Sequence, residues 1–185
     1  MPPPHTVRFA RSADVPTILS FIIKAAAEQA PDTVVEATEA SLSSTLHLDT
    51  SSQPSATTTT NPNPTPQPRF AWPLLIISPD GTTAGLAVYL YNFSTWRARP
   101  GVCLEELYVL PEYRRLGYGR LLVEAMAREA HAAGCAKMEW VCLRDNVRAL
   151  RFYEGLGAAR MDDWVVLKVG PEGIRGLAGR VGGLN

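Results

Sequence analysis

Residues 104–120 read LEELYVLPEYRRLGYGR, and this stretch decides the fold of the chain. Its apolar and aromatic side chains predict a strand up to Val109, and Pro111 ends that strand because proline cannot donate to a sheet ladder. Gly117 and Gly119 then open a helix with two residues that lack side chains. Backbone N–H groups can approach an anion directly at such a turn, so the pattern predicts a binding site for a pyrophosphate.

Other glycine-containing phosphate motifs do not fit this stretch. A P-loop needs a Gly-x-x-x-x-Gly-Lys-Ser/Thr spacing with its lysine, and a dinucleotide-binding fingerprint needs three glycines after a strand. Taken alone, the pattern Arg114-x-x-Gly117-x-Gly119 leaves a second interpretation open, a helix start loosened by glycine that binds nothing. The surrounding residues decide between the two interpretations.

Working outward, apolar periodicity and turn residues predict strands and helices on both sides of this turn. Strands are expected at residues 6–9, 70–77, 84–91, 101–109, 137–143 and 164–169, and helices at 15–29, from about 38, at 117–133 and at 146–156. The order predicts a mixed α/β (α+β) fold in which helices flank a central mixed, mostly antiparallel sheet. We expect one domain over residues 6–170, followed by a glycine-rich tail at 171–185.

Residues at about 48–69 are almost all Ser, Thr, Pro, Asn and Gln, so they have little to bury that could offset the entropy of ordering them. We expect a disordered insertion within the domain there. Lys plus Arg and Asp plus Glu number 18 each, so no net field attracts nucleic acid or an anionic membrane. The chain contains no apolar run of membrane-spanning length and no secretory signal pattern, so a cytoplasmic protein is expected.

Three cysteines and three histidines are scattered without the spacing of metal ligands or a disulfide framework, and we expect no metal. The sequence resembles the GNAT superfamily, and most closely its diamine acetyltransferase branch, which includes spermidine/spermine and thialysine acetyltransferases. The resemblance rests on residues 104–120, on the Asn146-to-Ala158 segment with its Phe152-Tyr153-Glu154, on Trp164, and on residues 92–96, NFSTW.

The resemblance implies acetyl-CoA as co-substrate. By similarity, the amides of Leu107 and Val109 would bond the pantetheine and polarise the thioester, and the turn would wrap the pyrophosphate. The residues expected to bind acetyl-CoA are Leu107, Tyr108, Val109, Arg114, Arg115, Leu116, Gly117, Tyr118, Gly119, Arg120, Asn146 and Tyr153. Asn146 is also a favoured helix N-cap, and both roles can hold.

An alkylamine with a pKa near 10.4 arrives protonated and must lose a proton before it can attack a thioester. The resemblance assigns that proton to Glu105, and it makes Tyr153 the acid that protonates the departing thiolate. Without the resemblance, Tyr153 would be interpreted as a core aromatic. In a regular strand Glu106 points to the face opposite Glu105, so only one of the two carboxylates is expected to line the site.

The expected acceptor is the primary amine of a small diamine, polyamine or basic amino acid, bound by Trp96, Glu105, Glu28 and Glu36. An acidic residue that polyamine enzymes carry just before Trp96 is missing here, which favours a shorter substrate than a long polycation. Two alternatives stay open, a peptide or protein amine acetyltransferase and a non-catalytic acyl-CoA-binding module. Similarity also implies a homodimer.

Overall fold

The computed structural model describes residues 5–50 and 68–179. The chain divides into two compact units, Met1–Leu143 and Arg144–Asn185. The first unit contains the whole sheet, and the second contains α4 (Val147–Glu154) and α5 (Pro171–Ala178). No helix in the described residues is long and apolar enough to cross a membrane. Residues 51–67 of the expected insertion lie outside the described part of the chain.

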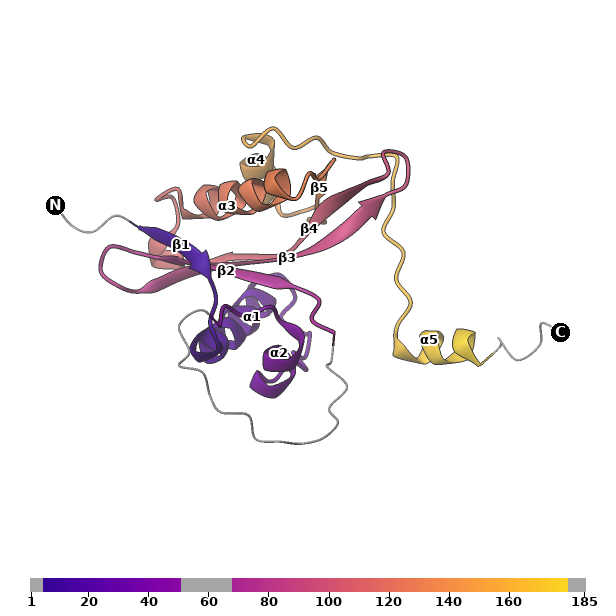
Figure 1. The fold of residues 1–185 in the computed structure, drawn as a ribbon, viewed down its shortest axis with the longest axis horizontal. Helices are drawn as coiled ribbons and strands as arrows, with labels where there is room; N and C mark the ends of the chain where they lie inside the picture. Colours follow the sequence, from indigo (N-terminus) through magenta and orange to yellow (C-terminus); the bar gives the residue numbers. More distant parts are fainter. Residues whose placement is uncertain (1–4, 51–67, 180–185) are drawn as a thin grey trace. The chain divides into compact units, whose positions relative to one another are not determined.

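Five strands form one sheet in sequence order, which confirms the expected mixed, mostly antiparallel architecture (Figure 1). Neighbours pair antiparallel from the first strand to the fourth, and only the last pair is parallel, at Val102 with Met138 and Cys103 with Glu139. The strands are β1 (Thr6–Phe9), β2 (Trp72–Ile77), β3 (Thr83–Ser94), β4 (Arg99–Val109) and β5 (Met138–Glu139). The hairpin between β2 and β3 turns at Gly81, whose φ of 86° a glycine adopts without strain.

Helices cover both faces of this sheet. In Figure 1, α1 (Val15–Gln29) and α2 (Glu39–Thr45) lie against one face and α3 (Tyr118–Ala132) lies against the other. The apolar residues of α1 at helical spacing, Ile18, Phe21 and Ala25, are buried against Leu75 and Leu86 of the sheet. The helix pattern expected from sequence is therefore confirmed, and it places α1 and α2 over the middle of β3 and β4.

The last expected strand, at residues 164–169, is wrong, because the structure has no strand there. Its apolar side chains are exposed instead, with Leu167 at 89%. High β-propensity describes how well side chains fit a half-buried pleated surface, and a strand also needs a paired neighbour. The strand expected at 137–143 is likewise shorter, reduced to the two residues of β5, and part of the expected tail forms α5.

The pairing of β3 with β4 contains a β-bulge. Val88 lies opposite Glu106 while the next residue, Tyr89, lies opposite Leu104, so Glu105 is an extra residue without a partner on β3. A bulge shifts by one position the alternation of side chains along the strand that carries it. The side chains before and after Glu105 therefore follow two different alternations between the faces of the sheet. This irregularity affects which side chains of β4 line the site.

Candidate active site

Among the described residues no strand pairs with the edge of β4 that faces away from β3 beyond Cys103, where pairing with β5 ends, and we call this the open edge. Leu110 N–H donates to the Ala84 carbonyl of the neighbouring chain segment at 3.0 Å. Because alternate residues of an antiparallel strand turn their backbone groups to the same neighbour, the groups of Tyr108 face β3 and those of Leu107 and Val109 face the open edge. The two amides expected to hold a pantetheine chain thus lie on the side of the strand that can accept one.

The turn after β4 leads directly into the N-terminus of α3. Gly117 is the N-cap of this 15-residue helix with φ of 84°, no side chain caps the helix, and its first turn contains no acidic residue. A Cβ added at Gly117 would meet none of the other described residues within 4 Å, so there is free space beside this end of the helix. Uncapped N–H groups and the helix dipole favour an anion here, which fits the diphosphate of acetyl-CoA.

Two arginines of the turn are exposed. Arg115 adopts φ of 65°, a left-handed conformation that non-glycine residues rarely take, and strain of this kind is concentrated at ligand-binding turns. Arg120 lies in the first turn of α3, and its Nη1 is 3.6 Å from Oε1 of Glu124. Together with the exposed Leu116, these residues surround the N-terminus of α3 with positive charge and little steric cover.

The tyrosines of the motif support the site from inside. Tyr108 is 5% exposed, and its ring packs against Phe21 of α1 at 5.5 Å between centroids. Tyr118 is buried and stacks on Tyr113 at 6.0 Å. Their side chains therefore stabilise the fold beneath the turn.

Glu28 and Arg114 were expected to serve different ligands, but the structure pairs them with each other. Arg114 Nη2 lies 2.7 Å from both carboxylate oxygens of Glu28, and Arg114 Nε donates to the Val109 carbonyl at 2.8 Å. The Tyr108 hydroxyl donates to Glu28 at 3.3 Å. This cluster ties the end of α1 to the start of the turn, so direct contact of Glu28 or Arg114 with a ligand would require the pair to open.

A second anchor, which sequence reasoning missed, holds the short 3₁₀ helix η2 (Pro111–Tyr113). The Tyr113 hydroxyl donates to Asp80 in the β2–β3 turn at 2.7 Å. Hydrogen bonds from the Ser78 hydroxyl and then from Tyr113 hold the pKa of Asp80 well below its ordinary value. The turn between β4 and α3 is thus held by two contacts, one to Glu28 of α1 and one to Asp80 of the β2–β3 hairpin.

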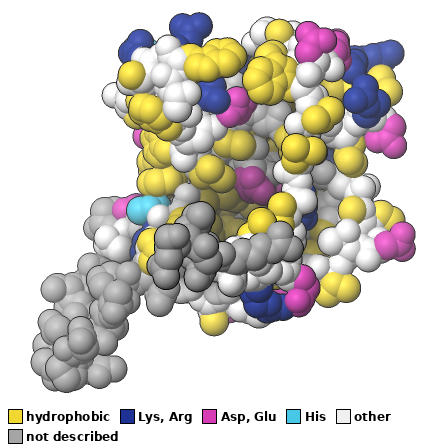
Figure 2. Space-filling view, turned by 90° about the vertical axis from the view of Figure 1, so that its right-hand side faces the viewer, with side chains coloured by type: hydrophobic (Ala, Val, Ile, Leu, Met, Phe, Trp, Pro, Cys, Tyr) yellow, Lys and Arg dark blue, Asp and Glu magenta, His cyan; other side chains and the backbone are white. Residues whose placement is uncertain are grey.

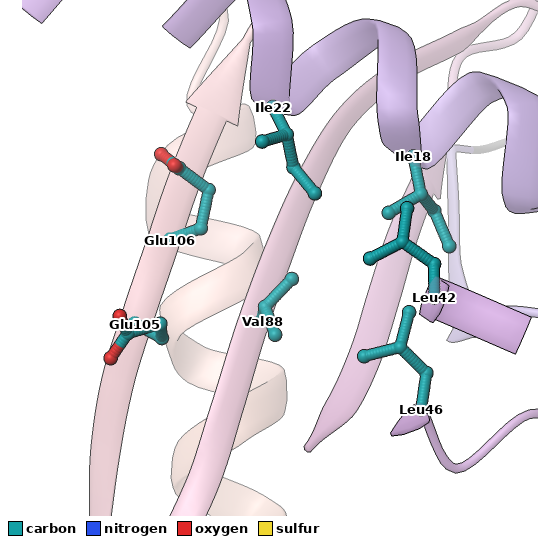
Figure 3. Close-up of a pocket in the computed structure, with 7 residues that line it drawn as sticks. All are labelled: Ile18, Ile22, Leu42, Leu46, Val88, Glu105 and Glu106. Carbon is teal, nitrogen blue, oxygen red and sulfur yellow. The ribbon is translucent and has the colours of Figure 1, made fainter. Parts of the chain in front are cut away.

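A cavity of about 280 Å³ lies between α1, α2, β3 and β4 (Figure 3). Its walls are aliphatic on the helix side and over β3, and two carboxylates from β4 stand at one end (Figure 3). Figure 2 shows acidic side chains set among hydrophobic ones on one face of the molecule. The lining residues are Ile18, Ile22, Leu42, Leu46, Val88, Glu105 and Glu106.

Both neighbouring glutamates line this cavity, so the expectation that only one of them would do so is wrong. The reason is the bulge at Glu105, which removes the regular alternation on which the expectation rested. Burial raises the pKa of Glu106, and the charge of Glu105 adds to the rise, while a hydrogen bond from the Leu107 amide opposes it. Glu106 is the more buried carboxylate, and no local pattern in the sequence distinguishes it.

Two residues expected to bind substrate are not brought to the cavity. Trp96 is 89% exposed in the turn between β3 and β4, seven residues beyond Tyr89 or roughly 23 Å along an extended strand. Glu36 is exposed in the segment between α1 and α2.

Asn146 and Tyr153 belong to the second unit. Asn146 is the N-cap of α4, and its Oδ1 accepts a hydrogen bond from the Ala149 amide at 3.1 Å, which confirms the capping role. The Tyr153 ring is half-buried beside Phe152, at 5.1 Å between centroids. Their contacts with acetyl-CoA stay predictions. The described residues contain no cluster of three or more His, Cys, Asp or Glu that could hold a metal ion.

Comparison with known proteins identifies the class to which this strand, turn and helix belong. The model of the acetyltransferase (GNAT) family matches residues 44–158, so the chain belongs to the GNAT family. This confirms the resemblance seen in residues 104–120 and 146–158.

Two relatives and one solved structure show how similar the chain is to individual proteins. The chain is 30% identical over 98 residues to the L-ornithine N5-acetyltransferase of Arabidopsis thaliana, covering 53% of this chain and 43% of that protein. It is 34% identical over 106 residues to the thialysine N-epsilon-acetyltransferase of Bos taurus, covering 55% and 62%. The chain therefore matches about half of the length of these relatives. An integron cassette protein from the V. cholerae mobile metagenome shares the fold, with a TM-score of 0.68 at 17% identity over 95% of this chain and 98% of that one.

Proposed function

We propose that this protein transfers the acetyl group of acetyl-CoA to the primary amine of a small molecule, by direct attack within a ternary complex. One observation carries the proposal: the open edge of β4 runs past a cavity with two carboxylates and ends at the uncapped N-terminus of α3. An activated acyl group and an amine can therefore meet along one strand, with groups for proton transfer beside them.

Acetyl-CoA supplies an acetyl group already activated as a thioester. The outward amide of Val109 would hold the pantetheine arm and donate toward the thioester oxygen, where negative charge develops, and the Leu107 amide would join it when its hydrogen bond to Glu106 opens. The N-terminus of α3, Gly117 and the exposed Arg115 and Arg120 would hold the diphosphate. In this arrangement Arg114 positions the turn through Glu28 and Val109.

The amine arrives as an ammonium ion and must lose one proton to expose its lone pair. Glu105, directly or through water, accepts that proton in the proposed mechanism. The nitrogen then forms its bond to the thioester carbon, the carbon–sulfur bond breaks, and the sulfur leaves with the bonding electrons. Tyr153 is proposed to protonate the thiolate, and the acetylated nitrogen gives its remaining surplus proton back to the Tyr153 oxygen, so the step needs neither a metal nor an oxidant.

The relatives that are named for ornithine and thialysine support a basic amino acid, or by extension a diamine or polyamine, as acceptor. The cavity volume of about 280 Å³ is at the lower end of small-ligand sites, roughly 300–1,000 Å³, and supports a small molecule over a peptide. A cytoplasmic homodimer remains part of the proposal.

The test is a thiol-release assay with acetyl-CoA across monoamines, diamines, basic amino acids and peptides, on wild type, Glu105→Gln and Tyr153→Phe. We expect turnover on free amines, and a fall of about 10²- to 10⁴-fold in kcat for each variant without loss of acetyl-CoA binding. Faster turnover on peptides would replace the small-molecule acceptor. Binding of acetyl-CoA without thiol release on any amine would make the protein a non-catalytic acyl-CoA-binding module.

A further inference from the structure

The cavity beside β4 separates charge from apolar surface. Glu105 and Glu106 stand on β4 at one end, and Val88 forms the floor next to them (Figure 3). Beyond Val88 the walls come from Ile18 and Ile22 of α1, from Leu42 of α2 and from Leu46, the residue directly after α2. We call the part lined by these five aliphatic side chains the aliphatic slot.

The acidic end is suited to a cation. Glu106 is half-buried, and among the described residues none of the groups that shift its pKa is a base. The groups that face it are the Glu105 carboxylate, the Leu107 amide and uncharged aliphatic side chains. Glu105 is exposed and Glu106 is half-buried, so the two adjacent carboxylates repel each other across a partly solvated site, and an ammonium ion placed between them relieves the repulsion and the burial cost of Glu106.

The aliphatic slot offers nothing to a second charge. Within the described residues its lining contains no basic side chain and no carboxylate other than the two glutamates at the acidic end. Glu28 is held by Arg114. A second ammonium or a free carboxylate in the slot would be an unpaired charge against aliphatic surface, which costs several kcal/mol.

We propose that the acceptor is an amine with a single positive charge and an apolar body, an alkylamine or arylalkylamine, whose ammonium lies between Glu105 and Glu106 and whose body occupies the aliphatic slot. This inference rests on the proposed acetyltransferase function, and it replaces the basic amino acid, diamine or polyamine that the names of the relatives support by a singly charged amine, because the slot offers no partner to a second charge. Glu106 is then a specificity-determining residue that holds the ammonium while Glu105 accepts the proton. Each methylene buried in the slot increases affinity about fourfold, so affinity rises with chain length until the slot is full.

A matched pair of acceptors tests this directly. Pentylamine and 1,5-diaminopentane have the same carbon chain and differ by one terminal ammonium. We expect kcat/KM for pentylamine to exceed that for diaminopentane, ornithine and spermidine by at least tenfold, and to increase from propylamine to pentylamine. Equal or faster turnover of the diamine or of ornithine would overturn the inference and leave the acetyltransferase function intact. No turnover on any amine would instead refute the proposed function.

Variants of the slot provide the second test. Ile22→Glu places a carboxylate in the wall where a second ammonium would lie, and Ile23→Glu, at the neighbouring residue that is 49% exposed and outside the lining, is the matched control. We expect Ile22→Glu to shift the preference at least tenfold toward diaminopentane, and Ile23→Glu to leave it unchanged. Identical preferences in the two variants would contradict the slot.

The third variant, Glu106→Gln, tests the acidic end without changing its volume. We expect KM for pentylamine to rise at least tenfold while the affinity for acetyl-CoA stays the same. An unchanged KM would remove Glu106 from amine binding. Thermal stabilisation by acetyl-CoA serves as the check that each variant is folded.

Discussion

The turn around Gly117 and the cavity beside Glu105 and Glu106 are neighbours along β4. The turn presents backbone groups, whereas the cavity is lined by side chains. The turn around Gly117 uses backbone N–H groups, a helix N-terminus and glycines that keep it open. The cavity uses side chains from four elements that are far apart in sequence, and its two carboxylates meet only because of a bulge. The proposed contacts with the co-substrate therefore depend on a conformation that a short motif specifies, while the proposed contacts with the acceptor depend on packing that no short motif contains.

The largest effect is expected from a charge at the turn. Gly117→Asp places a carboxylate at the N-terminus of α3, where the diphosphate would bind, and Asp tolerates the left-handed conformation better than most residues. We expect isothermal titration to show acetyl-CoA affinity reduced by about 100-fold, roughly 2.8 kcal/mol.

The matched control for this change is Gly81→Asp. Gly81 has φ of 86° against 84° at Gly117, and a Cβ there also meets nothing within 4 Å. It lies in the β2–β3 turn, so its variant should bind acetyl-CoA as wild type does. Equal affinity of the two variants would show that the N-terminus of α3 does not hold the diphosphate.

A smaller loss is expected where the two regions are joined. Arg114→Lys keeps the positive charge but removes the planar fork that binds Glu28 and the Val109 carbonyl together. We expect acetyl-CoA affinity to fall about tenfold and the amine KM to change less. If acetyl-CoA affinity and the amine KM worsened by the same factor, the Glu28–Arg114 pair would support the fold as a whole and not the turn in particular.

The acidic end of the cavity should show a stability effect that depends on pH. The pKa of Glu106 is raised in the folded protein, so its contribution to stability is fully present below its unfolded value of about 4.5 and is lost as the pH rises through the folded pKa. Glu106→Gln should therefore raise Tm at pH 7 by about 2–4 °C, for a gain on the order of 1 kcal/mol, and leave Tm unchanged near pH 4. Differential scanning calorimetry at both values measures this, and a lower Tm at pH 7 would contradict the assignment.

The smallest effect concerns Arg115, whose φ of 65° is strained for a residue with a side chain. Arg115→Gly should stabilise the free protein by about 0.5–1 kcal/mol and weaken acetyl-CoA binding severalfold through loss of charge. Thermal unfolding with and without acetyl-CoA separates the two effects. Destabilisation of the free protein would show that the Arg115 side chain supports the turn in the absence of ligand.

Sequence predicted well the parts that depend on local pattern. The strand before Pro111, the turn at Gly117 and the helix after it follow from residues within 17 positions of one another, and the structure has each of them. The N-cap at Asn146 is local in the same sense, since its partner is three residues away.

The remaining features depend on pairings between distant residues. The bulge that places both Glu105 and Glu106 beside the cavity depends on the register between β4 and Val88 of β3. The Glu28–Arg114 pair joins residues 86 positions apart. Residues 164–169 show the converse error, because a strongly β-prone segment was assigned a strand without a neighbour to pair with. The turn around Gly117 could therefore be predicted from the sequence, whereas three residues expected to bind the acceptor, Trp96, Glu28 and Glu36, are absent from the lining of the cavity. Their contacts with a substrate stay predictions.

The proposed function requires that the turn at Gly117 bind the diphosphate of acetyl-CoA through backbone donors. Calorimetric titration of the purified protein with acetyl-CoA, and in parallel with acetyl-pantetheine, which lacks the diphosphate, tests this directly. We predict saturable binding of acetyl-CoA at one site per chain and at least 100-fold weaker binding of acetyl-pantetheine. Equal affinities, or no saturable heat with acetyl-CoA, would contradict it.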